Sequence, residues 1–187
     1  LEKRWCDYWL KSIGDGKFVE ANCFQTGSNT WKYYDSWPPK NATMKKLYVT
    51  KDHKASFTKP SSAKGSVSYI SDPASPVPYR SLPIEATYGK GSRWGTWHVE
   101  DQRFVSTRPD VVSFIMDSLS ENVTVTGKVM VHLFASTTGT DADFVVKLID
   151  VYPAFDTSNW KMSGYQLPVA MEVIRGRYRK SFTLPSP

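Results

Sequence analysis

The sequence predicts a mainly β protein, a sandwich or jelly roll of short antiparallel strands. Apolar and polar side chains alternate between Val123 and Ser136, which is the period-two pattern of a half-buried strand. The run from Phe144 to Leu148 repeats this pattern. Many short runs separated by turn signals are typical of sandwiches and jelly rolls. The predicted strands are residues 46–50, 66–70, 111–115, 123–136, 144–153 and 168–182.

Residues 1–13 predict an amphipathic helix. Large apolar side chains recur there at helical spacing, and Gly14 and Gly16 then end the pattern. The apolar positions are Leu1, Trp5, Tyr8, Trp9 and Ile13. A Trp-rich face of this kind has to pack against something, and the rest of the chain reads as β-structure. We therefore expect the helix to belong to the end of a different, preceding α/β layer.

Two aromatic-rich segments predict irregular structure. Residues 18–39 predict a short strand, a Gly-Ser-Asn turn and a loop that closes at Pro38 and Pro39. Residues 72–96 are rich in Pro and Gly, which excludes a central strand or a helix. We expect a long crossover there, and long loops inside a compact domain are often functional or interfacial.

The composition is that of an ordinary globular chain, with 187 residues of which 22% are charged and 14% aromatic. No apolar run approaches the ~20 residues of a bilayer span, so we expect no membrane partner. The net charge of +6 is spread thinly, which argues against a nucleic-acid partner. Its one dense run, from Arg175 to Lys180, predicts a solvated strand face that pairs with carboxylates. Leu1 is not an initiator Met, so we expect any targeting segment to lie outside the chain.

The motifs RPDVVSF, GKVMVHLFAST and DADFVVKLIDVYP, in this order, resemble the C-terminal β-sandwich of a family of serine hydrolases. The family includes cocaine esterase, α-amino-acid ester hydrolase, glutaryl-cephalosporin acylase and Xaa-Pro dipeptidyl-peptidase. The DYWL run and the F…G…W…WPP pattern of residues 24–39 are similar to the end of the family's catalytic domain. The DPASPVPY run resembles the ester hydrolase and acylase branch.

The resemblance implies a galactose-binding-like jelly-roll β-sandwich, with one N-terminal helix and a strand left from an α/β-hydrolase domain. Residues 1–40 would be the tail of that catalytic domain, and residues 41–187 a jelly roll that is incomplete at its C-terminus. The implied function is that of the non-catalytic C-terminal portion of a serine hydrolase. Its substrates would be small esters or amides, such as α-amino-acid esters or β-lactam side chains.

The resemblance also implies a role and partners for the segment. It would buttress the catalytic domain and cover its cleft. The partners would be its own α/β-hydrolase domain and, in a homo-oligomer, further copies of the chain. The implied location is periplasmic or secreted.

The chain itself offers no complete catalytic set. The nucleophile of such a hydrolase stands in a GxSxG elbow, and the sequence contains no GxSxG. The resemblance places the family's Ser, Asp and His in the α/β domain. His98 and Glu100 would share a face of an extended strand and form a His–carboxylate pair, but no third partner is evident. We predict no catalytic residue in this chain.

Acidic residues in one turn and strand are a second candidate site. Asp141, Asp143 and Asp150 lie there, but calcium prefers about six to eight oxygens in a tight loop. We therefore predict no metal and no cofactor. We expect Asp143 and Asp150 to accept hydrogen bonds from backbone N–H groups or from Arg108, in a structural motif that also includes Asp110.

Tyr88, Trp94 and Trp97 form the third candidate site, in the Pro- and Gly-rich segment. Jelly rolls of the galactose-binding kind stack exposed tryptophans on sugar rings, so one alternative is a stand-alone carbohydrate-binding module. The other is that the loop lines a substrate cleft of the catalytic domain. We favour the cleft, because the loop contains rigid prolines and the family is hydrolytic.

The two cysteines, Cys6 and Cys23, are too few for a disulfide scaffold and too far apart for a CxxC motif. We expect buried free thiols, although the sequence alone leaves their pairing open.

Overall fold

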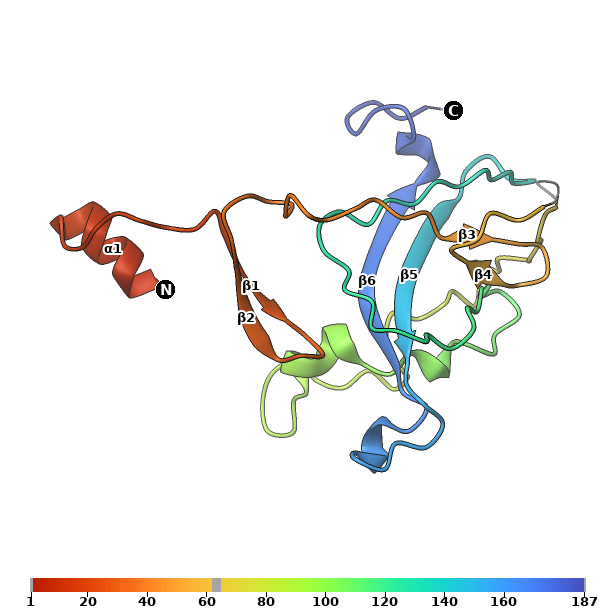
Figure 1. Cartoon of the computed structure of the whole chain (residues 1–187). Helices are drawn as coiled ribbons and strands as arrows, with labels where there is room; N and C mark the ends of the chain where they lie inside the picture. Colours follow the sequence, from red (N-terminus) through yellow and green to blue (C-terminus); the bar gives the residue numbers. More distant parts are fainter. Residues whose placement is uncertain (1, 62–64, 187) are drawn as a thin grey trace. The chain divides into compact units, whose positions relative to one another are not determined.

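The computed structural model describes residues 2–61 and 65–186. Its strands form three two-stranded antiparallel sheets, β1–β2, β3–β4 and β5–β6, and one α-helix, α1, lies near the N-terminus (Figure 1). Four short 3₁₀ helices complete the described elements: η1 Trp94–Val99, η2 Gln102–Phe104, η3 Trp160–Met162 and η4 Gly176–Tyr178. The prediction of a mainly β chain with an N-terminal helix is confirmed.

Two compact units make up the chain. The first contains the residues up to Lys45 together with Leu119–Lys128, and the second contains Lys46–Ser118 together with the residues from Val129 onward. The boundary predicted at residue 40 stays a prediction. None of the described helices is long and apolar enough to cross a membrane.

Helix α1 spans Glu2–Lys11. It ends where Ser12 adopts a left-handed φ of 58°, and the Ser12 amide donates to the Tyr8 carbonyl. Trp5 and Trp9 lie one turn apart with ring centroids separated by 6.3 Å. They remain 53% and 61% exposed, whereas Tyr8 is half-buried. Leu1, the first position of the predicted apolar face, lies outside the described residues.

Strands β1 (Ala21–Gln25) and β2 (Thr30–Tyr34) form a hairpin in the first unit. The sequence predicted the first strand and the turn, but it predicted a loop where β2 lies. Gly27 and Asn29 in the turn have φ values of 81° and 52°, a conformation that glycine and asparagine tolerate best. Across the hairpin Phe24 faces Trp31, and their rings meet edge-on at 5.4 Å.

The second unit begins with a very short sheet. Strands β3 (Tyr48–Val49) and β4 (Ala55–Ser56) pair antiparallel, and the Ala55 amide donates to the Ile115 carbonyl at 2.9 Å. Ala55 is buried at this junction. Of the strand predicted for residues 111–115, only Ile115 takes part in a bridge.

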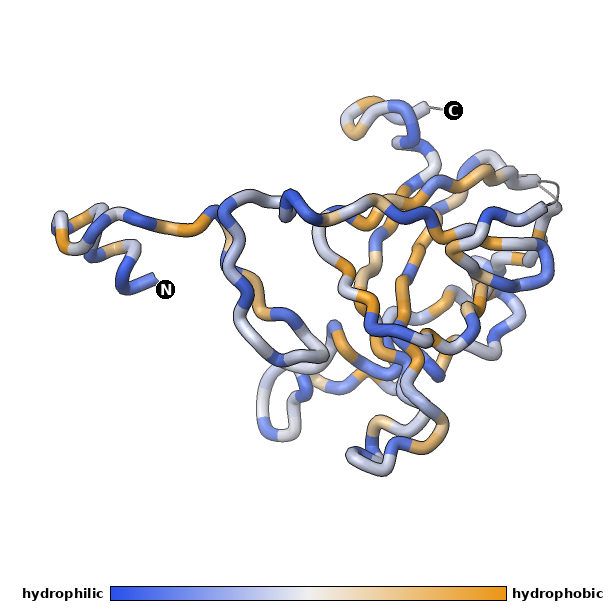
Figure 2. Tube along the Cα trace, in the orientation of Figure 1, coloured by the Kyte–Doolittle hydropathy of each residue, from blue (hydrophilic) through white to orange (hydrophobic). Residues whose placement is uncertain are grey.

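The longest sheet pairs β5 (Asp143–Val151) with β6 (Gln166–Arg175). Figure 2 marks apolar residues along both strands. The register shifts between Leu148 and Ile149, so that β6 carries a bulge. Pro168 lies at this bulge, where the missing N–H of proline costs no regular ladder bond.

The strand predicted to reach residue 182 ends at Arg175, and η4 follows. At Gly176 the backbone amide donates to the Ala142 carbonyl, and a Cβ at this position would lie 2.6 Å from that oxygen. The chain therefore turns out of the sheet here. The arginines do not share one strand face, but two of them pair with carboxylates as predicted: Arg175 with Asp143 and Arg177 with Asp141.

Residues 66–70 and 123–136 were predicted as strands, and the structure assigns neither to a sheet. The alternation is present, but Val129, Val131 and Leu133 are each about half exposed, at 48%, 49% and 52%. Alternation decides which side chains share a face, whereas a ladder also needs a neighbouring backbone. No described strand pairs with residues 123–136. The complete jelly roll therefore stays a prediction.

Candidate functional site

We define the aromatic loop as residues 79–100 of the second unit. The structure brings together all three aromatic residues that the sequence singled out there. Trp94 and Trp97 meet edge-on with centroids 5.0 Å apart, and Tyr88 lies 6.2 Å from Trp94. Tyr88 is 82% exposed and Trp94 54%, so the cluster presents an aromatic surface to solvent.

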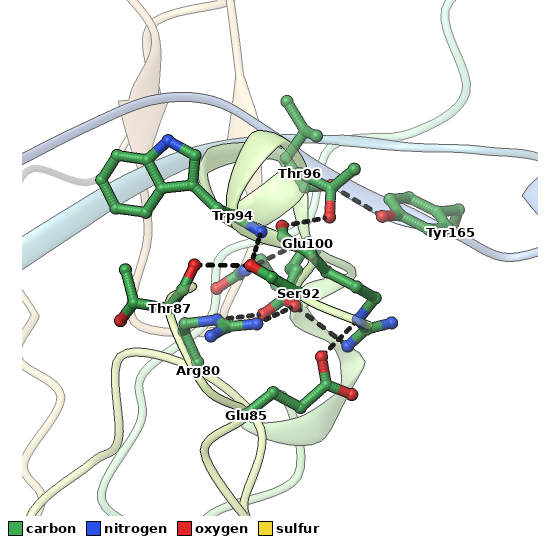
Figure 3. A network of polar contacts seen from close by, with 11 residues as sticks. Arg80, Glu85, Thr87, Ser92, Trp94, Thr96, Glu100 and Tyr165 are labelled. Atoms are coloured by element: carbon green, nitrogen blue, oxygen red, sulfur yellow. Dashed lines mark hydrogen bonds and ion pairs between the residues drawn. The ribbon is translucent and has the colours of Figure 1, made fainter. Parts of the chain in front are cut away.

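The local fold of the loop follows from its glycines and its serine. Gly89 and Gly91 have φ values of 104° and 86°, which side-chain-bearing residues rarely adopt. The Ser92 hydroxyl donates to the Thr87 carbonyl and accepts from the Trp94 amide, at the start of η1 (Figure 3). These contacts turn the chain so that Trp94 enters the short helix.

A buried ion pair supports the loop from beneath. The Arg80 guanidinium donates two hydrogen bonds to the Glu100 carboxylate, at 2.9 Å from Nε and 2.6 Å from Nη2. Arg80 is only 4% exposed and Glu100 9%. The hydrogen bonds from Arg80 hold the pKa of Glu100 below its ordinary value. The guanidinium also lies 4.0 Å from the centroid of the Trp97 ring, so the ion pair fixes one of the three aromatic residues.

Arg93 extends the network toward the surface. It donates to Glu85 at 2.8 Å and to Glu100 at 3.1 Å (Figure 3). Arg80 and Arg93 thus share the two glutamates, Glu85 and Glu100. The arrangement is suited to holding an aromatic surface in place rather than to acid–base chemistry.

The segment that follows the loop anchors it to the β5–β6 sheet. Gln102 is 3% exposed and donates to the Glu100 carbonyl, and its own oxygen accepts from Lys147 of β5 at 2.6 Å. The Tyr165 hydroxyl donates to the Val99 carbonyl at 2.6 Å. Asp101 accepts from the amide at the start of β6. The aromatic surface is thus connected to the longest sheet by several hydrogen bonds.

The expected His98–Glu100 pair does not form. The pair required an extended strand, but residues 94–99 form η1. His98 Nδ1 instead lies 3.1 Å from the Tyr79 hydroxyl, and the Glu100 carboxylate binds arginines. The helical turn points the two side chains to different partners.

The structural motif around Arg108 differs from the expectation in its partners. The guanidinium donates twice to Asp110, at 2.8 Å and 2.6 Å, and once to the Ser75 carbonyl at 2.7 Å. It does not bind Asp143 or Asp150, because a carboxylate two residues away is already in reach. These groups line an open hollow of about 650 Å³. Its residues are Tyr69, Ile70, Asp72, Ser75, Arg108, Pro109 and Asp110.

The remaining acidic residues lie apart. Asp143 pairs with Arg175 across the sheet, and Asp150 lies opposite Leu167 in the register. Within the described residues no three His, Cys, Asp or Glu side chains come together as metal ligands. The two cysteines are free thiols, but neither is buried as expected: Cys6 is exposed, because the helix turns it to solvent, and Cys23 is half-buried.

Sequence reasoning found the aromatic residues and missed their support. Arg80 and Glu100 are separated by 20 positions, and neither stands in a recognisable motif. Gln102 and Lys147 are separated by 45 positions and belong to a short helix and a strand. Polar residues in a Pro-rich segment carry no periodic signal for such pairing.

The fold and the site define a β-rich domain that presents an aromatic loop, and comparison with known proteins gives its family. Residues 18–182 match the family of the X-Pro dipeptidyl-peptidase C-terminal non-catalytic domain. The chain belongs to this family.

Among curated relatives, the cocaine esterase of Rhodococcus sp. (strain MB1 Bresler) is 28% identical over 175 residues, which is 89% of this chain and 28% of that protein. Among solved structures, an aminopeptidase from a marine sediment Thaumarchaeota archaeon aligns with a TM-score of 0.92 and 40% identity over the whole chain. A selenomethionine-labelled α-amino acid ester hydrolase aligns with a TM-score of 0.89 and 40% identity. The chain spans 30% and 31% of these two structures. It is therefore a non-catalytic C-terminal domain of a family of esterases and ester hydrolases.

Proposed function

We propose that this chain is the non-catalytic C-terminal portion of a serine hydrolase that acts on small esters or amides, such as α-amino-acid esters or β-lactam side chains. It buttresses an α/β-hydrolase domain of the same polypeptide and covers its cleft. The relatives named cocaine esterase and α-amino acid ester hydrolase support the reaction class. The segment shared with this chain is 28% of the first and 31% of the second, which leaves room for a catalytic domain.

The observation that carries the cleft assignment is the aromatic loop. It presents Tyr88 and Trp94 to solvent, yet a buried ion pair and the sheet hold its base in place. Large exposed aromatic groups on a fixed support are suited to contacting a partner or a ligand without ordering cost. We assign this surface to the wall of the substrate cleft.

The open face of α1 supports docking on the catalytic domain. Trp5, Trp9 and Leu10 are all more than half exposed, at 53%, 61% and 76%. Exposed aromatic clusters of this kind mark surfaces that another chain segment or domain covers. We assign residues 1–40 to the end of the α/β-hydrolase domain, whose own core covers this face.

The alternating polarity of residues 123–136 supports a larger β-sandwich. It alternates in polarity as a strand does, and no described strand pairs with it. An unpaired strand is a template for a neighbour. We assign the neighbouring strands to further residues of the same polypeptide, which complete the jelly roll.

The parent coding sequence tests this function. We expect a GxSxG motif upstream of Leu1. A polypeptide that extends through this motif should hydrolyse a p-nitrophenyl ester of an α-amino acid, and the 187-residue chain alone should not. Absence of the motif, or hydrolysis by the isolated chain, would count against the assignment.

The cleft role has a sharper test in the extended protein. Trp94→Ala should lower kcat/KM by about tenfold, since an apolar contact in a pocket contributes about that much. Trp160→Ala is the matched control, because Trp160 is an exposed tryptophan, at 77%, outside the loop. Equal effects of the two substitutions on kcat/KM would show that the loop does not line the cleft.

A carbohydrate-binding module is the second candidate, and the 82% exposure of Tyr88 beside Trp94 is the observation that favours it. If the chain is such a module, addition of a monosaccharide should quench its tryptophan fluorescence, and Trp94→Ala should abolish this quenching. An unchanged spectrum at millimolar sugar would exclude it.

A further inference from the structure

The hollow beside Arg108 combines apolar walls with polar groups. Its volume of about 650 Å³ is in the range of small-molecule sites. Tyr69, Ile70 and Pro109 supply apolar surface, and Tyr69 and Ile70 remain 45% and 85% exposed. All of the lining residues belong to the second unit, so the hollow lies within one compact body. Its polar groups decide which ligand it can hold.

Asp72 brings an exposed carboxylate to the hollow. The Ala74 amide donates to Asp72 Oδ1 at 2.8 Å, and the Ser75 amide donates to the Asp72 carbonyl at 3.1 Å. This tight turn fixes the position of the side chain. Among the ion pairs of the described residues, none includes Asp72. Its second carboxylate oxygen, Oδ2, can therefore accept a hydrogen bond from a ligand.

Arg108 has its counter-ion in Asp110, which also lines the hollow. Nε and Nη2 donate to Asp110, and Nη2 also donates to the Ser75 carbonyl at 2.7 Å. Because Ser75 closes the turn that begins at Asp72, a single turn positions both polar groups. The third nitrogen, Nη1, has no acceptor among the described residues and is not enclosed. It can therefore donate to a ligand.

The balance of charge around the hollow favours a cationic ligand. Asp110 neutralises the guanidinium, so the charge of Asp72 is the one left over among the lining residues. A protonated amine can form a charge-assisted hydrogen bond with Asp72, and an aromatic ring such as that of Tyr69 also attracts a cation. A neutral carbonyl oxygen suits Arg108 Nη1, because this guanidinium already has its counter-ion. An anionic ligand would face the unpaired carboxylate.

We propose that this hollow binds a small primary ammonium ion that carries an apolar group and a neutral carbonyl. The ammonium group binds Asp72, the carbonyl oxygen accepts from Arg108 Nη1, and the apolar group lies against Ile70 and Pro109. None of the lining residues belongs to the aromatic loop. The proposal goes beyond the proposed function, because this binding needs no catalytic domain and no hydrolysis.

The test is an NMR titration of the isotope-labelled 187-residue chain with L-phenylalaninamide. The titration is done at about pH 6, where the α-amino group of this probe is protonated. The backbone amide signals of Ala74 and Ser75 should shift and saturate, with a Kd of about 1 mM for a ligand of this size. Absence of a saturable shift at these two amides up to about 50 mM probe would overturn the proposal.

Two related probes test the recognition with the protein unchanged. N-acetyl-L-phenylalaninamide has no ammonium group and should bind about fivefold more weakly, since an exposed ion pair contributes about that much. Phenethylamine has no carbonyl and should bind about threefold more weakly, because it lacks one hydrogen bond. If the acetylated probe bound as tightly as L-phenylalaninamide, the ammonium group would not be what the hollow recognises, and the proposal would fail.

A pair of variants connects the binding to Asp72. Asp72→Asn removes the charge but keeps a side-chain oxygen for the turn, and it should raise the Kd of L-phenylalaninamide about fivefold. Asp117→Asn is the matched control, because Asp117 is a 98% exposed carboxylate of the same unit outside the hollow. An equal Kd in both variants would contradict the proposal. No hydrolysis is measured, so this outcome is distinct from failure of the hydrolase assignment.

Discussion

The aromatic loop and helix α1 both display clustered tryptophans, yet they are held in different ways. In α1, Trp5 and Trp9 lie one turn apart, and the pairs of Asp7 with Lys3 and Lys11 join side chains four positions apart on an exposed surface. In the loop, Trp97 lies on a buried arginine whose partner, Glu100, is 20 positions away. Local contacts thus support the first cluster, and long-range buried contacts support the second.

The difference teaches where each cluster is vulnerable. An exposed ion pair contributes up to about 1 kcal/mol, because water screens it. Removing one member of a buried pair costs more, because the remaining charge stays desolvated. Single substitutions should therefore disturb the loop strongly and α1 weakly.

The largest effect should follow Glu100→Gln. Loss of the carboxylate leaves Arg80 buried beside a neutral amide, and we expect the free energy of unfolding to fall by about 3 kcal/mol. Urea unfolding followed by tryptophan fluorescence measures it. Glu85→Gln is the control, since Glu85 binds Arg93 at an exposed site and should change stability by less than about 1 kcal/mol. Similar losses in both variants would contradict the comparison.

Acid should weaken the same support. The folded-state pKa of Glu100 is lowered, mainly by hydrogen bonds from Arg80, so its contribution is present above the ordinary pKa of 4.5 and is lost as pH falls through the folded pKa. We expect the free energy of unfolding to decrease from about pH 4.5 downward. Glu100→Gln should show a shallower decrease, with the remaining slope due to other paired carboxylates such as Asp110 and Asp141. If the free energy of unfolding fell with pH in parallel for the two proteins, Glu100 would not be a source of the acid sensitivity.

A smaller effect should follow Tyr165→Phe. This substitution removes the hydroxyl that donates to the Val99 carbonyl and should cost about 1 kcal/mol. It should also speed proteolysis of the loop while α1 is cleaved at the same rate as before. Tyr33→Phe is the matched control, because Tyr33 is 64% exposed on the hairpin. Faster cleavage in both regions would mean that the loop is not anchored separately.

The smallest effect should come from α1. Asp7→Asn removes the partner of Lys3 and Lys11 and should cost about 0.5 kcal/mol, the sum expected for two exposed pairs one turn apart. Circular dichroism at 222 nm should decrease slightly, and the fluorescence of the loop should stay constant. A loss of stability as large as that caused by Glu100→Gln would contradict the expectation that α1 is less sensitive than the aromatic loop.

The same distinction explains what the sequence could predict. Helix α1 and strand β5 have local periodicity, and each was predicted close to its observed place. The strand and turn that begin the β1–β2 hairpin were also predicted, whereas β2 was expected to be a loop and β6 was expected to continue beyond Arg175. Residues 123–136 have the same periodicity, but none of the strands in the described residues pairs with them, so the pattern alone overstated the sheet. Arg108 was matched with distant aspartates, although Asp110 was the carboxylate within reach. Pairing over long distances in the chain has no one-dimensional signature.

The bulge in β6 has a further consequence. Because two residues, Pro168 and Val169, occupy the interval that one would fill, the inward and outward sides of β6 exchange at this point. On one side of the bulge the Gln166 amide donates to Asp101, and on the other side the Arg175 side chain pairs with Asp143. The inserted residue thus divides β6 into two halves, each with its own polar contact. A substitution in one half should leave the alternation of side chains in the other half unchanged.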